Sequence, residues 1–206
     1  MVSVRNSVVI PVGEKQTHEA KFVSFHGLSD GKEHIALVFK EADSGQAVPL
    51  VRLHSECLTG DVFHSARCDC GQQLDEAIEL MAQKGGILLY LRQEGRGIGL
   101  YNKLDAYSLQ DTGLNTFEAN NALGFENDLR DFSIAAQMLQ ALGVTEIDLL
   151  TNNPEKVATI EQHNVKVRRQ QTTGVFYNRH NGHYLAAKAE VAKHHIDLRR
   201  QNKLAS

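Results

Sequence analysis

The sequence predicts an α/β fold, mixed α+β in character, in which a β-rich N-terminal part precedes alternating strands and helices around a partly parallel sheet. Short apolar or alternating runs, separated by turns that contain Gly and Asp, occupy the first third of the chain. After residue 70, short apolar runs alternate with stretches of helical periodicity. Such alternation is typical of parallel strands joined by helices, with ligands bound at the carboxyl ends of the strands.

The first third of the chain contains three expected strands, at residues 20–26, 34–39 and 48–53. A helix is expected next, because the apolar residues from Leu74 to Met81 are spaced by three and four positions and therefore share one face. The pair Gly85 and Gly86 is expected to end that helix.

The rest of the chain is expected to alternate, with strands at 87–91, 147–150 and 165–167 and helices at 100–110 and 132–142. Asn153 can cap a further helix, and Pro154 suits its first turn. The polar segments Arg92–Gly99 and Thr151–Lys156 directly follow two of these strands. They are therefore expected at the edge of the sheet where ligands bind.

The bulk properties indicate one domain over residues 1–206, with disordered ends. No apolar run approaches the roughly 18 residues of a membrane helix, and the charged first twenty residues do not resemble a signal peptide. A net charge of -3 argues against nucleic-acid binding, which needs a concentrated basic surface. We therefore expect a cytoplasmic protein without membrane or nucleic-acid partners.

The three cysteines, Cys57, Cys68 and Cys70, are crowded into one short segment. An odd, crowded set is poor material for disulfides and typical of metal ligands in a reducing compartment. Three thiolates can bind zinc and leave a fourth position for a water that the metal acidifies, as a hydrolase needs. The spacing leaves two alternatives open: a closed structural site with His54 or His64 as fourth ligand, and unrelated buried cysteines.

The glycine-rich segment Arg92–Gly99 stands between an expected strand and an expected helix. Glycines allow a ligand to approach the backbone, free amides at a helix start attract anions, and Arg96 can add bidentate donors to phosphate. The segment lacks the Walker pattern. A simple turn with solvated arginines is the ordinary alternative.

Other polar residues each have an ordinary structural interpretation beside a functional one. Asp128 and Asp131 precede a helix and can serve as caps. Lys156 can be a solvated side chain after a helix-start turn, and Tyr107 can be an aromatic residue at the edge of the core.

Taken together, five segments resemble the GTP cyclohydrolase II family in order and approximate spacing. They are Arg52-Leu-His-Ser-Glu-Cys-Leu-Thr-Gly-Asp61, Arg67-Cys-Asp-Cys-Gly71, Arg92–Gly99, Glu118-Ala-Asn-Asn121 and Leu150-Thr-Asn-Asn-Pro154. The resemblance is strong over residues 50–160 and departs after residue 165. There the chain reads Val167-Arg-Arg-Gln-Gln-Thr172, where family members carry a Glu-Arg-Val-Pro-Leu-like stretch.

The resemblance implies one Zn²⁺ per chain, held by Cys57, Cys68 and Cys70, and Mg²⁺ bound with the triphosphate of GTP. It further implies that the residues contacting GTP are Arg52, Leu53, His54, Ser55, Glu56, Gln73, Glu94, Gly95, Arg96, Thr116, Thr151 and Lys156.

The resemblance also implies a mechanism, in which Asp128 is the proton acceptor, Arg130 the nucleophile at the α-phosphate and Tyr107 an essential group near the opening ring. A guanidinium is a poor nucleophile, so charge stabilisation is the more conservative role for Arg130. The expected enzyme is a homodimeric hydrolase that converts GTP to formate, pyrophosphate and the first intermediate of riboflavin synthesis. The alternatives are a diverged paralogue that stops at a formylated product and a zinc-stabilised nucleotide-binding regulator without activity.

Overall fold

The computed structural model describes residues 2–13, 18–40, 48–126, 128–182 and 184–185. The chain forms two compact units, each assembled from three segments. The sheet unit comprises residues 1–55, 74–92 and 131–173, and the cysteine unit comprises residues 56–73, 93–130 and 174–206. The ends that the sequence predicts to be disordered fall on residue 1 and residues 186–206, outside the described residues.

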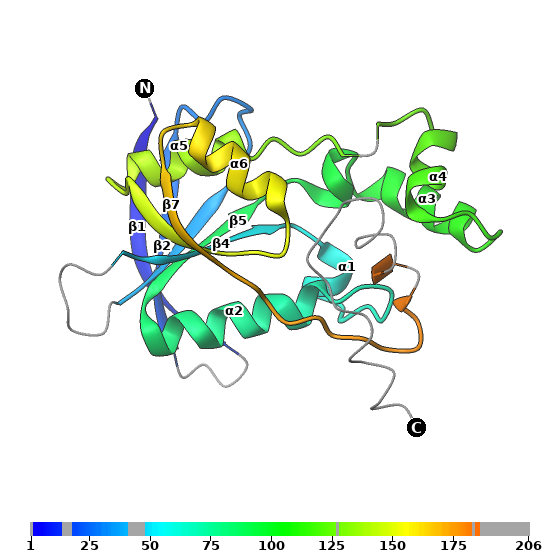
Figure 1. The fold of residues 1–206 in the computed structure, drawn as a ribbon, viewed down its shortest axis with the longest axis horizontal. Coiled ribbons are helices and arrows are strands. Elements are labelled where there is room, and N and C mark those ends of the chain that lie inside the picture. The colour runs from blue at the N-terminus through cyan, green and yellow to red at the C-terminus, as the bar shows by residue number, and fades with distance from the viewer. Residues whose placement is uncertain (1, 14–17, 41–47, 127, 183, 186–206) are drawn as a thin grey trace. The chain divides into compact units, whose positions relative to one another are not determined.

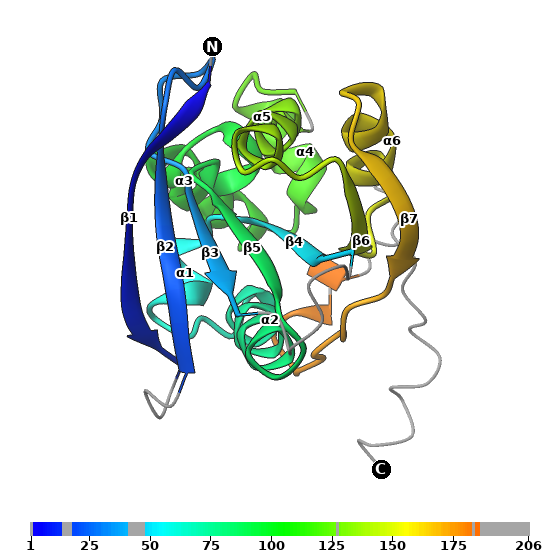
Figure 2. The same cartoon turned by 90° about the vertical axis from the view of Figure 1, so that its left-hand side faces the viewer.

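The sheet unit contains one seven-stranded sheet in the order β1-β2-β3-β5-β4-β6-β7 (Figure 2). Its strands are β1 Ser3–Val12, β2 His18–His26, β3 Ile35–Phe39, β4 Leu50–Ser55, β5 Gly86–Leu91, β6 Glu146–Leu150 and β7 Lys166–Gln171. The first three strands and β5 pair antiparallel, whereas β4 pairs parallel with β5 and β6, and β6 pairs parallel with β7. The predicted fold class is confirmed.

The described helices are α1 Leu58–Asp61, α2 Cys70–Lys84, the 3-10 helix η1 Glu94–Gly97, α3 Leu100–Gln110, α4 Thr116–Ala122, α5 Ser133–Ala141 and α6 Pro154–Gln162 (Figure 1). The predicted helices at 100–110 and 132–142 correspond to α3 and α5. Among the described residues, no helix is long and apolar enough to cross a membrane.

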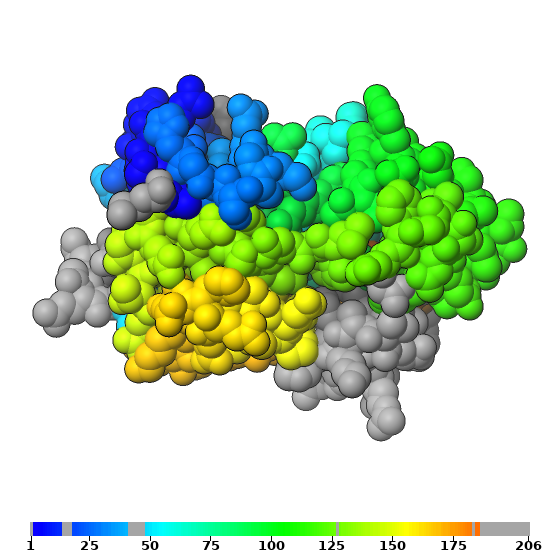
Figure 3. Space-filling model, turned by 90° about the horizontal axis from the view of Figure 1, so that it is seen from above, coloured from blue at the N-terminus to red at the C-terminus, as the bar shows by residue number. Residues whose placement is uncertain are grey.

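Both faces of the central strands are buried, because helices cover the sheet on each side. In β5, Leu89 and Leu91 belong to the cluster that includes α5 and α6, whereas Leu88 belongs to the cluster around Ala77 and Met81 of α2. Figure 2 shows α2 on one face of the sheet and α5 and α6 on the other, and Figure 3 shows α5 and α6 packed side by side. Burial on both faces explains why β5 reads as a continuous apolar run.

The parallel arrangement brings the carboxyl ends of β4, β5 and β6 to one edge of the sheet. Arg52–Ser55 form the end of β4, Arg92 follows β5, and Thr151–Lys156 follow β6. The predicted placement of polar residues after the strands is therefore confirmed for this edge.

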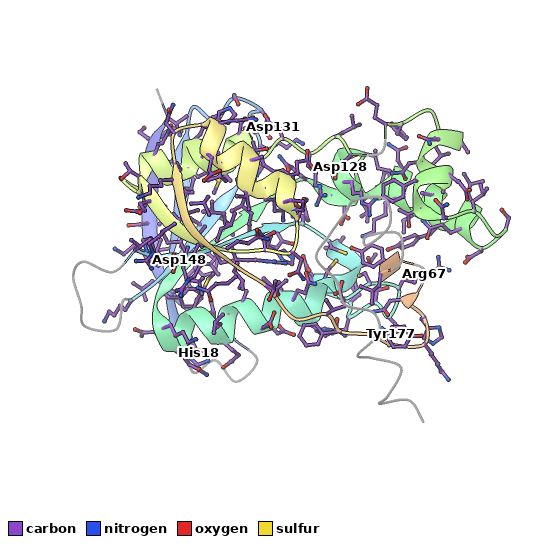
Figure 4. All side chains as sticks on the ribbon, in the orientation of Figure 1. His18, Arg67, Asp128, Asp131, Asp148 and Tyr177 are labelled. Carbon is purple, nitrogen blue, oxygen red and sulfur yellow. The ribbon has the colours of Figure 1, made fainter. Side chains whose placement is uncertain are left out.

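The segment that departs from the family pattern forms the edge strand β7. Arg168 and Arg169 both donate to the buried Asp148 carboxylate at 2.8 Å, and Figure 4 labels Asp148 on β6. These hydrogen bonds lower the pKa of Asp148, because they stabilise its ionised form. The two arginines thus fasten the edge strand to its neighbour through one carboxylate.

The start of α6 follows the sequence signals, since the Asn153 side chain accepts from the Glu155 backbone N–H at 2.9 Å. We expect Asn153→Ala to lower the free energy of unfolding by about 1 kcal/mol, because it removes this cap. Urea unfolding of the variant measures the change. Gln162→Ala, at the exposed last residue of α6, is the control. Equal stability of the two variants would show that the cap contributes nothing.

Candidate active site

The three cysteines converge in the cysteine unit. Their Sγ atoms lie within 4.8 Å of one another, and those of Cys57 and Cys68 are 3.6 Å apart. Zinc–sulfur bonds of about 2.3 Å in a tetrahedral site separate two sulfurs by roughly 3.8 Å, so the observed spacing suits such a metal. No cysteine is in a disulfide. The cluster can therefore hold a metal ion.

Two glycines let the cysteine-bearing segments approach closely. A Cβ atom on Gly60 would lie 2.8 Å from the Cys68 sulfur and 3.1 Å from the Cys57 sulfur. A Cβ atom on Gly71 would lie 2.5 Å from the Gly60 carbonyl oxygen. The backbones of α1 and the start of α2 therefore touch where the sulfurs meet, and any side chain at either glycine would force them apart.

We expect Gly60→Ala to reduce the metal content of the purified protein well below that of the unmodified chain. The added methyl group overlaps two of the sulfur positions, so the cysteines can no longer reach one ion together. Metal analysis of the variant provides the measurement. Val62→Ala, at an exposed side chain two residues away, should keep its metal. Full metal content in Gly60→Ala would contradict this account of the packing.

Neither histidine considered as a fourth ligand belongs to the group of residues that could hold a metal ion. His64 is exposed, and its backbone has a positive φ of 51°. His54 lies in β4 of the sheet unit, with its ring stacked on Tyr90 at a centroid distance of 5.5 Å. Among the described residues, the metal-binding group consists of the three cysteines without a histidine.

A buried lysine contacts the cysteine cluster. The Lys103 ammonium group donates to the Cys57 sulfur at 3.2 Å, to the Thr59 hydroxyl at 3.0 Å and to the Glu94 carboxylate at 2.9 Å. Burial opposes its charge, but the negative charges of Cys57 and Glu94 outweigh burial and raise the pKa of Lys103. Its charge is therefore retained throughout the neutral range.

The glycine-rich segment forms η1, with Gly95 and Arg96 both in the left-handed region at φ 61° and 59°. The next glycine, Gly97, lies so close to Leu129 that a Cβ atom would be 2.9 Å from it. Leu129 also donates its backbone N–H to the Arg96 carbonyl at 2.9 Å. This contact brings the Asp128–Arg130 segment alongside the turn that carries Arg96.

The guanidinium group of Arg96 has an environment that suits the binding of an anion. Its guanidinium group lies 4.5 Å from the centre of the Phe117 ring. Burial is the main cause that lowers the pKa of Arg96. Its Nη1 atom is buried and, among the described residues, has no hydrogen-bond partner. A buried N–H donor without an acceptor costs free energy. An anion bound at this position would supply the acceptor, so the side chain suits an anion-binding site.

Asp128 and Arg130 form a bidentate pair in which Arg130 Nε donates to Asp128 Oδ1 at 2.8 Å and Nη2 donates to Oδ2. Burial opposes ionisation of Asp128, but the hydrogen bonds and charge of Arg130 outweigh it and lower the pKa of the carboxyl group. Asp131, by contrast, accepts from the Ser133 N–H at the start of α5. The N-cap position of α5 is Phe132, so neither aspartate occupies it, although Asp131 satisfies an N–H group of the first turn; Figure 4 labels both.

Tyr107 lies on α3, half-buried in the cysteine unit. The Arg67 guanidinium is 4.8 Å from the centre of its ring, and the Lys103 ammonium is 5.7 Å away. Burial raises the pKa of Tyr107 to about 12. The hydroxyl group therefore stays protonated at neutral pH and can donate a hydrogen bond.

In the sheet unit, the residues predicted to contact GTP gather at the carboxyl edge. The Arg52 guanidinium donates to the Leu150 carbonyl at 3.2 Å, and the Lys156 ammonium donates to the Leu53 carbonyl at 2.7 Å. The Thr151 hydroxyl accepts from the Asn153 N–H. Ser55 Oγ is buried and has no hydrogen-bond partner among the described residues. Both cations are buried, so Lys156 is not the solvated side chain considered above.

The remaining predicted contacts belong to the cysteine unit. Gln73 is buried and donates to Asp69 at 2.8 Å and to the Gly174 carbonyl at 3.2 Å. Glu56 and Thr116 are half-buried, Thr116 as the first residue of α4. The predicted residues thus form two groups, one at the carboxyl edge of the sheet and one in the cysteine unit.

Three residues near the cysteines carry no prediction from the sequence. They are Gly60, Lys103 and Tyr184, whose hydroxyl lies 3.6 Å from the Cys70 sulfur. Gly60 lies in one of the segments that resemble the family, and a glycine there could have indicated that two backbone segments approach closely. The lysine and the tyrosine are distant in sequence from the cysteines they contact, so no local spacing indicates them.

Comparison with known proteins agrees with this geometry. The family model described as GTP cyclohydrolase II matches residues 7–172. The GTP cyclohydrolase-2 of Vibrio cholerae serotype O1 is 58% identical over 198 residues, which cover 96% of this chain and 100% of that protein. The GTP cyclohydrolase-2 of Vibrio vulnificus is 56% identical with the same coverage. That of Aliivibrio fischeri is 57% identical over 92% of this chain and 95% of the relative.

Proposed function

We propose that this chain hydrolyses GTP in the first step of riboflavin synthesis, because it belongs to the GTP cyclohydrolase II family. One water adds at C8 and the imidazole ring opens, a second releases formate, and a third separates pyrophosphate from the α-phosphate. The diaminopyrimidinone ribosyl phosphate is the remaining product. The observation that carries the proposal is the gathering of three sulfurs within 4.8 Å in a chain of this family.

Cys57, Cys68 and Cys70 would hold one Zn²⁺, and the sulfur spacing supports a tetrahedral thiolate site. Zinc with an open fourth position lowers the pKa of a bound water toward neutrality, which is the chemistry that attack at C8 needs. The exposed position of His64 supports an open site over the closed alternative.

The triphosphate is the proposed ligand of the cationic groups. In the cysteine unit, Arg96 has a buried Nη1 atom without a hydrogen-bond partner among the described residues. In the sheet unit, Lys156 and Arg52 are buried cations. A buried cation interacts strongly with phosphate because water does not screen it. Mg²⁺ would arrive with the substrate and neutralise part of the triphosphate charge. The other residues proposed to contact GTP are Leu53, His54, Ser55, Glu56, Gln73, Glu94, Gly95, Thr116 and Thr151.

Asp128, Arg130 and Tyr107 are the proposed catalytic residues. The lowered pKa of Asp128 keeps the carboxylate ionised and able to accept a proton. A guanidinium is a permanent cation, and Arg130 donates to Asp128 through Nε, which supports stabilisation of charge at the α-phosphate over nucleophilic attack. The protonated Tyr107 hydroxyl can donate to the ring that opens.

Three further properties belong to the same proposal. The chain would act as one catalytic domain over residues 1–206, and it would form a homodimer, as the family resemblance implies. Thiolate ligands persist in a compartment that keeps cysteines reduced, which supports the cytoplasm as its location. Light scattering on the purified protein tests the dimer.

The decisive test is to incubate the purified protein with GTP and Mg²⁺ and to measure formate and pyrophosphate together. Both products in equal amounts are expected. Pyrophosphate with a retained formyl group would identify the diverged paralogue, and GTP binding without either product would identify the regulator. The near full-length similarity to the GTP cyclohydrolase-2 proteins does not favour these alternatives.

A further inference from the structure

The Lys103 ammonium group donates directly to the Cys57 sulfur of the cysteine cluster. Lys103 lies on α3, 46 residues from Cys57, with 9% of its surface exposed. Its three N–H donors match three acceptors within 3.2 Å: the Cys57 sulfur, the Thr59 hydroxyl and the Glu94 carboxylate. All three N–H donors of the ammonium group therefore have an acceptor, and these hydrogen bonds hold the group in one position.

Glu94 extends this arrangement to two backbone segments. Its Oε2 atom accepts from the Leu58 N–H at 2.6 Å, in the residue that follows Cys57. Its Oε1 atom accepts from the Gly95 N–H at 2.8 Å as well as from Lys103. One carboxylate thus joins the first turn after Cys57 to the turn that carries Arg96.

The charges explain why a cation is needed here. Three thiolates and one divalent ion carry one excess negative charge, and Glu94 adds another in the same buried region. Without Lys103, the Cys57 sulfur would lose its charged donor and the buried Glu94 carboxylate would lose its ion pair. Leaving one partner of a buried ion pair uncompensated is strongly destabilising.

We infer that Lys103 is a positioning residue that holds the Cys57 sulfur for the metal and ties it, through Glu94, to the turn that carries Arg96. The inference rests on the proposed function only in requiring that the three cysteines bind Zn²⁺. It extends that function, because the site that holds the metal and the turn proposed to bind phosphate share one buried ion pair. Loss of the lysine should therefore disturb metal binding even without substrate.

Chelator competition on the zinc-loaded protein tests this inference without an activity assay. Lys103→Met removes the charge and keeps much of the side-chain volume, and Lys84→Met, at an exposed lysine of α2, is the matched control. We expect Lys103→Met to bind Zn²⁺ about 10- to 100-fold more weakly, the usual effect of removing a partner of a metal ligand. In protein loaded with Co²⁺, the sulfur-to-metal absorption band should shift in Lys103→Met and stay unchanged in Lys84→Met.

Three outcomes would overturn the inference. Zinc affinity and cobalt band equal to those of the unmodified protein in Lys103→Met would remove Lys103 from the metal site while leaving the proposed function intact. Absence of zinc binding by the unmodified protein would overturn both. If Lys103→Met does not fold, Lys103→Arg decides, because it keeps the charge but changes the donor at the Cys57 sulfur. A shifted cobalt band there supports the inference, and an unchanged band with unchanged zinc affinity overturns it.

Discussion

Cys68→Ser is expected to lose its zinc and to release no measurable formate from GTP. The Cys68 sulfur lies 3.6 Å from that of Cys57 at the centre of the buried cluster, and a serine hydroxyl is a far weaker ligand for zinc than a thiolate. Two thiolates would remain, and the binding energy of such a site depends on its full set of ligands. Metal analysis and a formate assay on the same preparation measure the two effects.

Pyrophosphate release should persist in part in Cys68→Ser, since Mg²⁺ and the phosphate-binding groups act at the other end of the substrate. Comparing the two products therefore separates loss of the metal from general misfolding. His54→Ala and His64→Ala are the companion variants, and each should retain one zinc per chain. Loss of zinc from either would indicate a closed site with a histidine ligand, and full formate production by zinc-free Cys68→Ser would remove the metal from the mechanism.

The elements with strong periodicity were predictable from the sequence. The apolar run of β5 and the apolar residues of β6 are buried, and α6 begins at the Asn153 cap, as its residue types indicate. β1 has no predicted counterpart, because it is an edge strand whose residues are almost all exposed and therefore show no buried face. α4 also has none, although Asn115 and Glu118 form the capping box that marks its start.

The candidate site also contains some residues that the sequence could predict and others that it could not. Cys57, Cys68 and Cys70 stand close together in the sequence, so their types and spacing were enough to predict a metal cluster. The contact between Cys57 and Lys103 depends on how α3 packs, and a lysine in a helix ordinarily reads as a solvated residue. The pairing of Asp128 with Arg130 was likewise hidden, because two residues at this spacing meet only in a particular loop conformation.

Tyr107→Phe is expected to lower the rate of formate release by roughly 10²- to 10⁴-fold, the usual contribution of a positioned proton donor. The substitution removes one hydroxyl group and leaves the ring that packs beside Arg67. Because the pKa of Tyr107 is about 12, that hydroxyl is protonated at neutral pH and its loss removes a donor. GTP binding should change little, so kcat should fall while KM stays nearly constant.

Tyr101→Phe provides the matched control for this change, because Tyr101 lies on the same helix with 81% of its surface exposed. The control should keep the unmodified rate and affinity. Steady-state kinetics with GTP and a direct measurement of GTP binding distinguish the possible roles of Tyr107. Equal loss of binding and turnover in Tyr107→Phe would place the residue among those that support the packing of α3. A fall in kcat alone would place its hydroxyl at the ring that opens, since only an interaction made in the transition state changes the rate without changing affinity.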